Sequence, residues 1–231
     1  MFCDTLDLEK GIIVSREHNR TFTDSGISLS GVLLVCSILS GMALVNTAYA
    51  TDVTRMVEPC FDCHGKNGVS TEAKVPTIAG YSEDYFTYSL DMYQKQDRPC
   101  VATEYPGGSK KGQKTDMCEI VKDMSEADIE LMGKYFAKLA FVRSQQSFDA
   151  EMAKKGEAIH LEKCDECHGE AGGDPEDNAG LLGGQKMDYL REQIGFVRNG
   201  QRFTSKKMRL RLEALGESEM EAVVQYYGSI H

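Results

Sequence analysis

The sequence predicts an all-α protein built from two similar helical halves, and three observations support this fold class. One short motif, Cys-x-x-Cys-His, occurs twice in the 231 residues. The segments that follow the two motifs are alike and show the apolar spacing of amphipathic helices. The chain contains no Trp and few runs of β-branched residues, which disfavours an extensive sheet.

The first fifty residues have the features of a secretory leader. The apolar run 31–45 is about fifteen residues long, which is short for a membrane span. It is followed by Ala48-x-Ala50, the small-residue pattern that a signal peptidase recognises. The residues before the run are unusually acidic, so a mis-assigned start codon or an uncleaved anchor is an alternative. We expect residues 1–50 to be a signal peptide and the mature chain to lie in the periplasm.

The predicted mature chain is acidic. Removing the three basic and five acidic residues of positions 1–50 leaves 23 basic and 31 acidic residues. A negative surface disfavours binding to nucleic acid or to anionic lipid, and it favours a protein partner with a basic docking face. The alternative is that the acidity serves only solubility.

The two Cys-x-x-Cys-His motifs have the spacing of covalent haem attachment. Two thiols three residues apart on one turn can form thioethers with the two vinyl groups of one porphyrin, and the following imidazole can then bind the iron. The sequence therefore predicts two covalently bound haem c groups. The residues assigned are Cys60, Cys63, Cys164 and Cys167 as thioether cysteines, and His64 and His168 as iron ligands.

Other uses of paired cysteines fit this pattern less well. A thioredoxin-like redox pair would need a neighbouring βαβ pattern, which the sequence lacks. A four-cysteine zinc site gives no role to the two matching histidines. Disulfides across three residues would be strained. We therefore expect the haem to carry the chemistry, and we assign no catalytic side chain.

An internal repeat relates the two halves. When Cys60 is aligned with Cys164, positions 104 residues apart correspond, and after an insertion of 13 residues in the first half the spacing becomes 91. The halves differ at Pro76, which corresponds to Gly180. Identical pairs at the first spacing include Gly80 and Gly184, Asp84 and Asp188, Tyr85 and Tyr189, and Arg98 and Arg202.

The repeat also predicts the second axial ligand of each iron. Class I cytochromes c use a methionine from a later segment, and Met117 corresponds to Met208 at the spacing of 91. Met124 corresponds to a leucine and is expected to be a packing residue. Ligation by a second histidine is the alternative, but His160 is too close to the second motif and His231 is the last residue.

Each half is predicted to contain a motif helix, a middle helix, a loop that carries the methionine, and a final helix. The apolar spacing places the middle helices at 82–96 and 186–198, and it begins the final helices at Ser125 and Glu217. A haem in each half would supply much of the core of so small a domain. The predicted domain limits are 51–144 and 145–231.

The insertion is bracketed by Cys100 and Cys118, which have no haem role. In an oxidising compartment we expect them to form a disulfide, which would contribute roughly 3 kcal/mol by closing its loop. The bridge could also hold the predicted methionine ligand beside it. Lys110, Lys111 and Lys114 form a small basic patch within the insertion, either a docking surface or a solvated loop.

With these motifs the mature chain resembles the class I dihaem cytochromes c. Within that group, the linker 146–149, the residues 156–160 and the run 206–208 resemble the haem subunit of flavocytochrome c sulfide dehydrogenase. That resemblance implies two haem domains related by a pseudo-twofold axis. It also implies a partner subunit, an FAD-containing flavoprotein that oxidises sulfide and passes electrons through the haems to an external acceptor.

A second resemblance supports an alternative function. The stretch 183–185, with 189–190 and Phe196, is similar to the soluble dihaem cytochromes that carry electrons to a terminal oxidase or reductase. Such a shuttle meets small soluble or membrane-bound redox partners and has no permanent one. An enzyme such as a dihaem peroxidase or a thiosulfate-oxidising cytochrome would need an open sixth position, which the two matched methionines disfavour. The sequence thus predicts a periplasmic electron-transfer cytochrome, first as the flavoprotein's haem subunit and alternatively as a shuttle.

Overall fold

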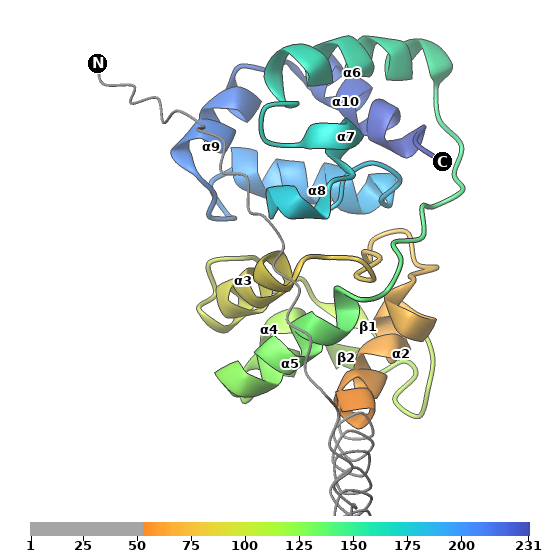
Figure 1. Ribbon diagram of the computed structural model, residues 1–231, viewed down its shortest axis with the longest axis vertical. Helices are drawn as coiled ribbons and strands as arrows, with labels where there is room; N and C mark the ends of the chain where they lie inside the picture. The colour runs from red at the N-terminus through yellow and green to blue at the C-terminus, as the bar shows by residue number, and fades with distance from the viewer. Residues whose placement is uncertain (1–52) are drawn as a thin grey trace, which may run out of the picture. The chain divides into compact units, whose positions relative to one another are not determined.

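The structure is a computed structural model that describes residues 53–231, so the predicted signal peptide lies outside the described residues. Within this range no helix is long and apolar enough to cross a membrane. The first half contains η1 (Glu58–Cys60), α2 (Phe61–His64), η2 (Lys66–Gly68), α3 (Glu83–Gln94), β1 (Thr103–Glu104), β2 (Lys114–Thr115), α4 (Met117–Val121) and α5 (Glu126–Phe136) (Figure 1). The second half contains α6 (Ala150–Lys163), α7 (Gly169–Gly172), η3 (Pro175–Asp177), α8 (Met187–Arg198), α9 (Lys206–Glu213) and α10 (Glu217–Gly228).

Short polar side chains define where several of these helices begin. Each accepts a hydrogen bond from a backbone N–H of the first turn, which would otherwise lack a partner. The caps are Ser82 for α3, Asp116 for α4, Ser125 for α5, Asp149 for α6 and Ser205 for α9. The two middle helices are confirmed to within two residues at both ends. The two final helices are confirmed to within two residues at their first residues, the only ends that were predicted.

The predicted methionine loops are wrong in detail. Met117 is the first residue of α4, and Met208 is the third residue of α9. The caps explain the difference, because Asp116 and Ser205 begin a helix immediately before each methionine. Both methionines therefore lie on short helices, and only the segments that lead to them are irregular.

Each half has its own hydrophobic core. In the first half, the ring of Phe136 on α5 stacks on Phe86 of α3 with centroids 5.1 Å apart. In the second half, α6 packs closely on α10 because Gly156 has no side chain, and a Cβ there would overlap the backbone of Ala222. The two halves are connected by residues 140–149, which have no regular structure and contain the predicted domain boundary.

Equivalent residues of the repeat exchange hydrogen bonds between the halves. Nη2 of Arg98 donates to the hydroxyl of Tyr189 at 2.6 Å, and Nη2 of Arg202 donates to the hydroxyl of Tyr85 at 3.4 Å. These are the same contact made in opposite directions, as a twofold axis requires. Gln185 and its counterpart Tyr81 hydrogen-bond to each other at 3.2 Å, which places them beside that axis.

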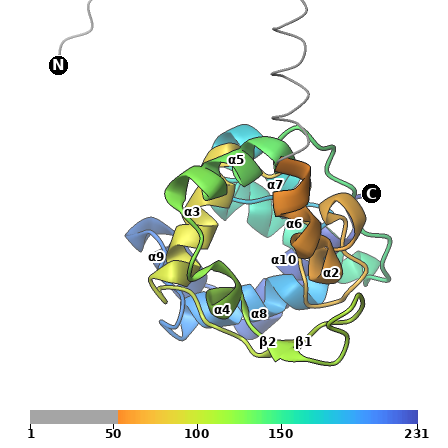
Figure 2. The same cartoon turned by 90° about the horizontal axis from the view of Figure 1, so that it is seen from below.

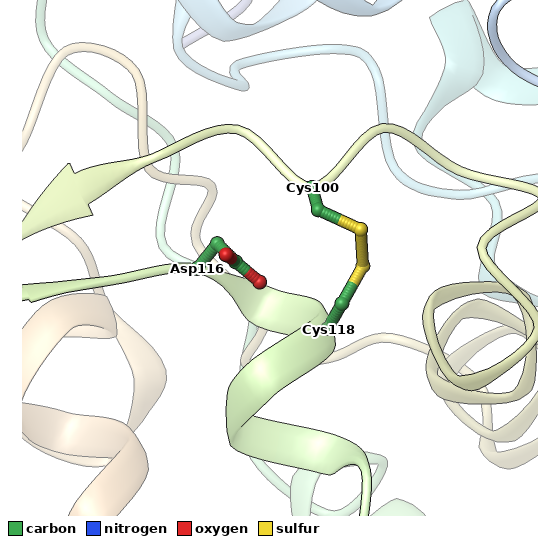
Figure 3. A group of neighbouring side chains, drawn as sticks. All are labelled: Cys100, Asp116 and Cys118. Carbon is green, nitrogen blue, oxygen red and sulfur yellow. A yellow bond between two sulfur atoms is a disulfide. The ribbon is translucent and has the colours of Figure 1, made fainter.

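The insertion of the first half is a departure from the all-helical expectation. It forms an antiparallel hairpin in which Thr103 pairs with Thr115 and Glu104 with Lys114. The predicted disulfide between Cys100 and Cys118 is confirmed, with Cα atoms 5.5 Å apart, and it closes the base of the hairpin (Figure 3). Strands form here because the disulfide holds side by side two segments that have no helical pattern.

Candidate haem sites

The first motif places His64 on α2 in the orientation of a metal ligand. The side chain is buried, and its Nδ1 donates a hydrogen bond to the carbonyl oxygen of Pro76 at 2.9 Å. This bond fixes the ring and leaves Nε2 available, the arrangement usual for ligating histidines. Burial lowers the pKa of His64, which favours the neutral imidazole that binds iron. In the sequence, the only sign of this hydrogen bond is that Pro76 differs from its repeat counterpart. The Cys-x-x-Cys-His motif by itself does not predict it.

The cysteines of the first motif do not resemble a redox-active pair. Cys60 and Cys63 are not joined in a disulfide, and burial raises the pKa of Cys60 to about 11. A reactive Cys-x-x-Cys pair instead needs a lowered pKa. Cys60 and Met117 both pack against the first core, so the structure brings an attachment cysteine and the predicted methionine ligand to one cluster.

The second motif borders a cavity of about 350 Å³, a size within the range of cofactor pockets. Cys164, Cys167, His168 and Met208 all line it, so the four predicted side chains of the second half meet at one site. The cavity is mainly apolar, as a porphyrin requires. Its apolar walls include Leu181, Leu182, Leu190, Val197, Leu212 and Val223.

The imidazole of His168 borders this cavity but is held differently from that of His64. Its Nδ1 is buried and has no hydrogen-bond partner within the described part of the chain. The bond that fixes the ring of His64 therefore has no equivalent at His168. Burial also lowers the pKa of His168, again favouring the neutral ring. The position of Pro76 is occupied here by Gly180, and the carbonyl hydrogen bond of the first half is not formed.

Two guanidinium groups between the halves have no carboxylate partner among residues 53–231. Arg98 is 4% exposed and donates to Gln193 and Tyr189, while Arg202 lines the cavity and donates to Gln193 and Tyr85. Neither forms a salt bridge with any residue in 53–231. Although burial raises the pKa of the Tyr85 phenol, the two guanidiniums bring it down to about 8. The region thus favours anionic groups, and haem carries carboxylates.

Comparison with known proteins was made on both sequence and structure. Residues 151–226 match the family model described as cytochrome c oxidase, cbb3-type, subunit III. Cytochrome c4 of Pseudomonas aeruginosa is 24% identical over 216 residues, which cover 86% of this chain and 98% of that protein. The structure of reduced recombinant cytochrome c4 from Pseudomonas stutzeri matches with a TM-score of 0.64 and 26% identity, covering 79% of this chain and 98% of the other. The chain is similar in sequence to the dihaem cytochromes c4 and has a cytochrome c4-like fold.

Two further solved structures share the cytochrome c4-like fold. Cytochrome c4 of Acidithiobacillus ferrooxidans has a TM-score of 0.57 and 24% identity, and covers 74% of this chain and 98% of that one. Thiosulfate dehydrogenase of Marichromatium purpuratum has a TM-score of 0.57 and 21% identity, and covers 74% of this chain and 36% of the other. The fold has two cytochrome c domains, which confirms the predicted fold class. Similarity to cytochrome c4 implies covalent haem c, and the eight individual side-chain assignments stay predictions.

Two other sets of potential metal ligands in this cytochrome c4-like chain contact other groups of the protein. Nδ1 of His160 lies 3.0 Å from the hydroxyl of Tyr227, and the imidazole is fully buried. Nε2 of His160 lies 3.4 Å from a carboxylate oxygen of Asp165. Cys100, Asp116 and Cys118 bring metal-binding atom types together, but the two sulfurs are joined and the carboxylate caps α4 (Figure 3).

Proposed function

We propose that this cytochrome c4-like chain is a periplasmic dihaem electron carrier that moves electrons between small redox partners and a terminal oxidase or reductase. The observation that supports this most strongly is the second-half cavity, where a haem-attachment motif and the matching methionine meet inside apolar walls. The repeat then assigns the same parts to the first half. Matches to proteins named cytochrome c4 extend over almost their whole lengths.

Bound haem would supply reversible one-electron oxidation and reduction. The cysteines of the two motifs would hold each group to the chain, and His64 and His168 would bind iron on one side. Met117 and Met208 would complete the ligand sets. Arg98 and Arg202 would bind the haem carboxylates, which would supply the counter-charges that the guanidiniums lack. The apolar walls would keep water from the iron and raise its reduction potential.

The shuttle function is placed ahead of the haem subunit of an FAD-containing sulfide dehydrogenase. The relatives described above are named as cytochromes c4 and a thiosulfate dehydrogenase, and these four names mention no flavoprotein partner. A permanent flavoprotein subunit would also require a sizeable apolar interface. A carrier that exchanges electrons in brief encounters does not need a large apolar interface.

Purification of the mature protein from its native periplasm tests this proposal. We expect a single dihaem chain that is reduced by a respiratory electron donor and does not react with sulfide. A co-purifying larger chain with flavin absorbance, together with haem reduction on addition of sulfide, would overturn the shuttle and favour the sulfide dehydrogenase subunit. The optical spectrum and the subunit composition give both answers.

A further inference from the structure

The hairpin of the insertion lies against the first haem-attachment motif. Gly108 is in the turn of the hairpin, and a Cβ atom added to it would overlap Oδ1 of Asp62. Asp62 is the third residue of that motif, between its two cysteines. The view from below shows the loop between β1 and β2 reaching toward α2 (Figure 2). The hairpin therefore covers the protein surface directly beside the predicted thioether bonds.

Among residues 53–231, nothing covers the second motif in this way. The insertion has no counterpart in the second half, and Cys167 is exposed where its equivalent, Cys63, is partly buried. Glu166, the counterpart of Asp62, is 67% exposed and is paired with Lys207 at 2.6 Å. The two predicted haems thus differ in how a partner protein can approach the attachment edge.

The hairpin is held as a defined structure. The disulfide between Cys100 and Cys118 closes its base. Beyond the strand pairs, the backbone N–H of Tyr105 donates to Gln113 at 3.1 Å, and that of Gly112 donates back to Tyr105 at 2.9 Å. A surface fixed by a disulfide and hydrogen bonds can present side chains to a partner with little ordering cost.

The hairpin presents unpaired positive charge on an acidic protein. Lys110, Lys111 and Lys114 are exposed, and no salt bridge within residues 53–231 involves them. Lys110 lies over the ring of Tyr105, 5.3 Å from its centroid. The acidic groups nearby are Asp62, Glu104 opposite Lys114, and Asp116 at the base of the hairpin. The outer part of the hairpin, residues 105–114, contains the three lysines and no acidic residue, so it is positively charged on an acidic chain.

We propose that the hairpin 100–118 is the docking surface for an acidic redox protein that exchanges electrons with the first haem. The second haem, whose attachment edge is not covered, then exchanges electrons with a different partner. The chain thus distinguishes its donor from its acceptor by the charge of their docking surfaces. Complementary charge raises the rate of encounter and excludes partners of the wrong sign. This inference depends on the proposed electron-carrier function and adds to it the chemistry of one partner.

Charge reversal on the hairpin tests the proposal, and the chain offers a matched control. The test variant is Lys110→Glu with Lys111→Glu. The control is Lys154→Glu with Lys155→Glu, two adjacent exposed lysines on α6 that undergo the same change in net charge. The probe is an acidic flavodoxin in its reduced form, mixed with the oxidised dihaem protein in a stopped-flow instrument. A second readout is the binding of oxidised flavodoxin, in which no electron moves.

At low ionic strength we expect the hairpin variant to react about tenfold more slowly than the wild type and to bind flavodoxin correspondingly more weakly. The control should change less than twofold, and the difference should vanish at high salt. Equal effects of both variants, or no effect of either, would overturn the docking surface. Haem content and redox titration of the wild type are measured first. A chain without two reversible haems would refute the carrier function and the docking proposal together, whereas intact haems with equal variant rates refute docking alone.

Discussion

The two haem-attachment motifs share their spacing but lie under different surfaces. The first is covered by the hairpin at Asp62, whereas the second leaves Cys167 exposed beside a cavity. The supporting imidazoles differ as well, because His64 is held by Pro76 and His168 has no equivalent bond. The repeated residues thus define the interior of each haem site, and the residues that are not repeated make the two haems unequal toward solvent and partners.

Removal of one pair of attachment cysteines should have the largest effect on this comparison. We expect Cys60→Ala with Cys63→Ala to leave one covalent haem per chain, and Cys164→Ala with Cys167→Ala to leave the other. Each loss should also weaken folding of its own half, because the haem replaces part of a small core. The haem-to-protein ratio after acid-acetone extraction measures the outcome. Loss of both haems from one double variant would show that the halves do not load independently.

Replacement of the predicted methionine ligands should alter the haem potentials. We expect Met117→Leu and Met208→Leu each to lower the potential of one haem by on the order of 0.1 V or more, because axial ligands set potentials over a range of about 0.8 V. Redox titration with optical detection measures this change. Met124→Leu and Met187→Leu are matched controls, since both pack in the cores and neither lines the second-half cavity, and neither should shift a potential. A shift from a control equal to that from a ligand variant would contradict the assignment.

The disulfide should matter for one half only. We expect Cys100→Ser with Cys118→Ser to lower the free energy of unfolding by roughly 3 kcal/mol, because the unfolded chain regains the freedom of the closed loop. Denaturant titration measures the loss, and the second haem's potential serves as an internal reference. A change in the first haem's potential would show that the bridge also positions Met117, whereas an unchanged potential would make the bridge purely structural.

The smallest expected effect comes from the contact between the hairpin and the first motif. Gly108 and Gly112 both have positive φ, +69° and +79°, but an added Cβ meets Asp62 at Gly108 and nothing within 4 Å at Gly112. We expect Gly112→Ala to report the backbone strain alone and Gly108→Ala to cost about 1 kcal/mol more. Thermal or denaturant unfolding compares them. Gly108→Ala should also make the first haem more accessible to small reductants, and equal accessibility in both variants would argue against the cover.

Much of the fold could be predicted from the sequence because it depends on local patterns. Helix caps, apolar spacing and the two motifs determined where α3, α5, α8 and α10 lie, and the repeat identified Met117 and Met208 as equivalent positions. The disulfide followed from two cysteines without another role. These features depend on residues close together in the chain or on a simple internal comparison.

The remaining features depend on contacts between distant residues. The repeat paired Arg98 with Arg202, but only the folded chain shows both guanidiniums between the halves without carboxylate partners. The placement of Gly108 on Asp62 could not be predicted, because a loop's position over its neighbours has no periodic signal. The helical setting of the methionines could not be predicted, because a single cap residue, Asp116 or Ser205, does not by itself indicate a short helix after it.

The central claim is that each half carries its own covalently bound, redox-active haem. Coulometric redox titration of the purified mature protein, combined with its intact mass, tests this most directly. We predict a mass that includes two haems and two reversible one-electron steps per chain. A mass with one haem or none, or a titration that accounts for a single electron, would contradict the claim.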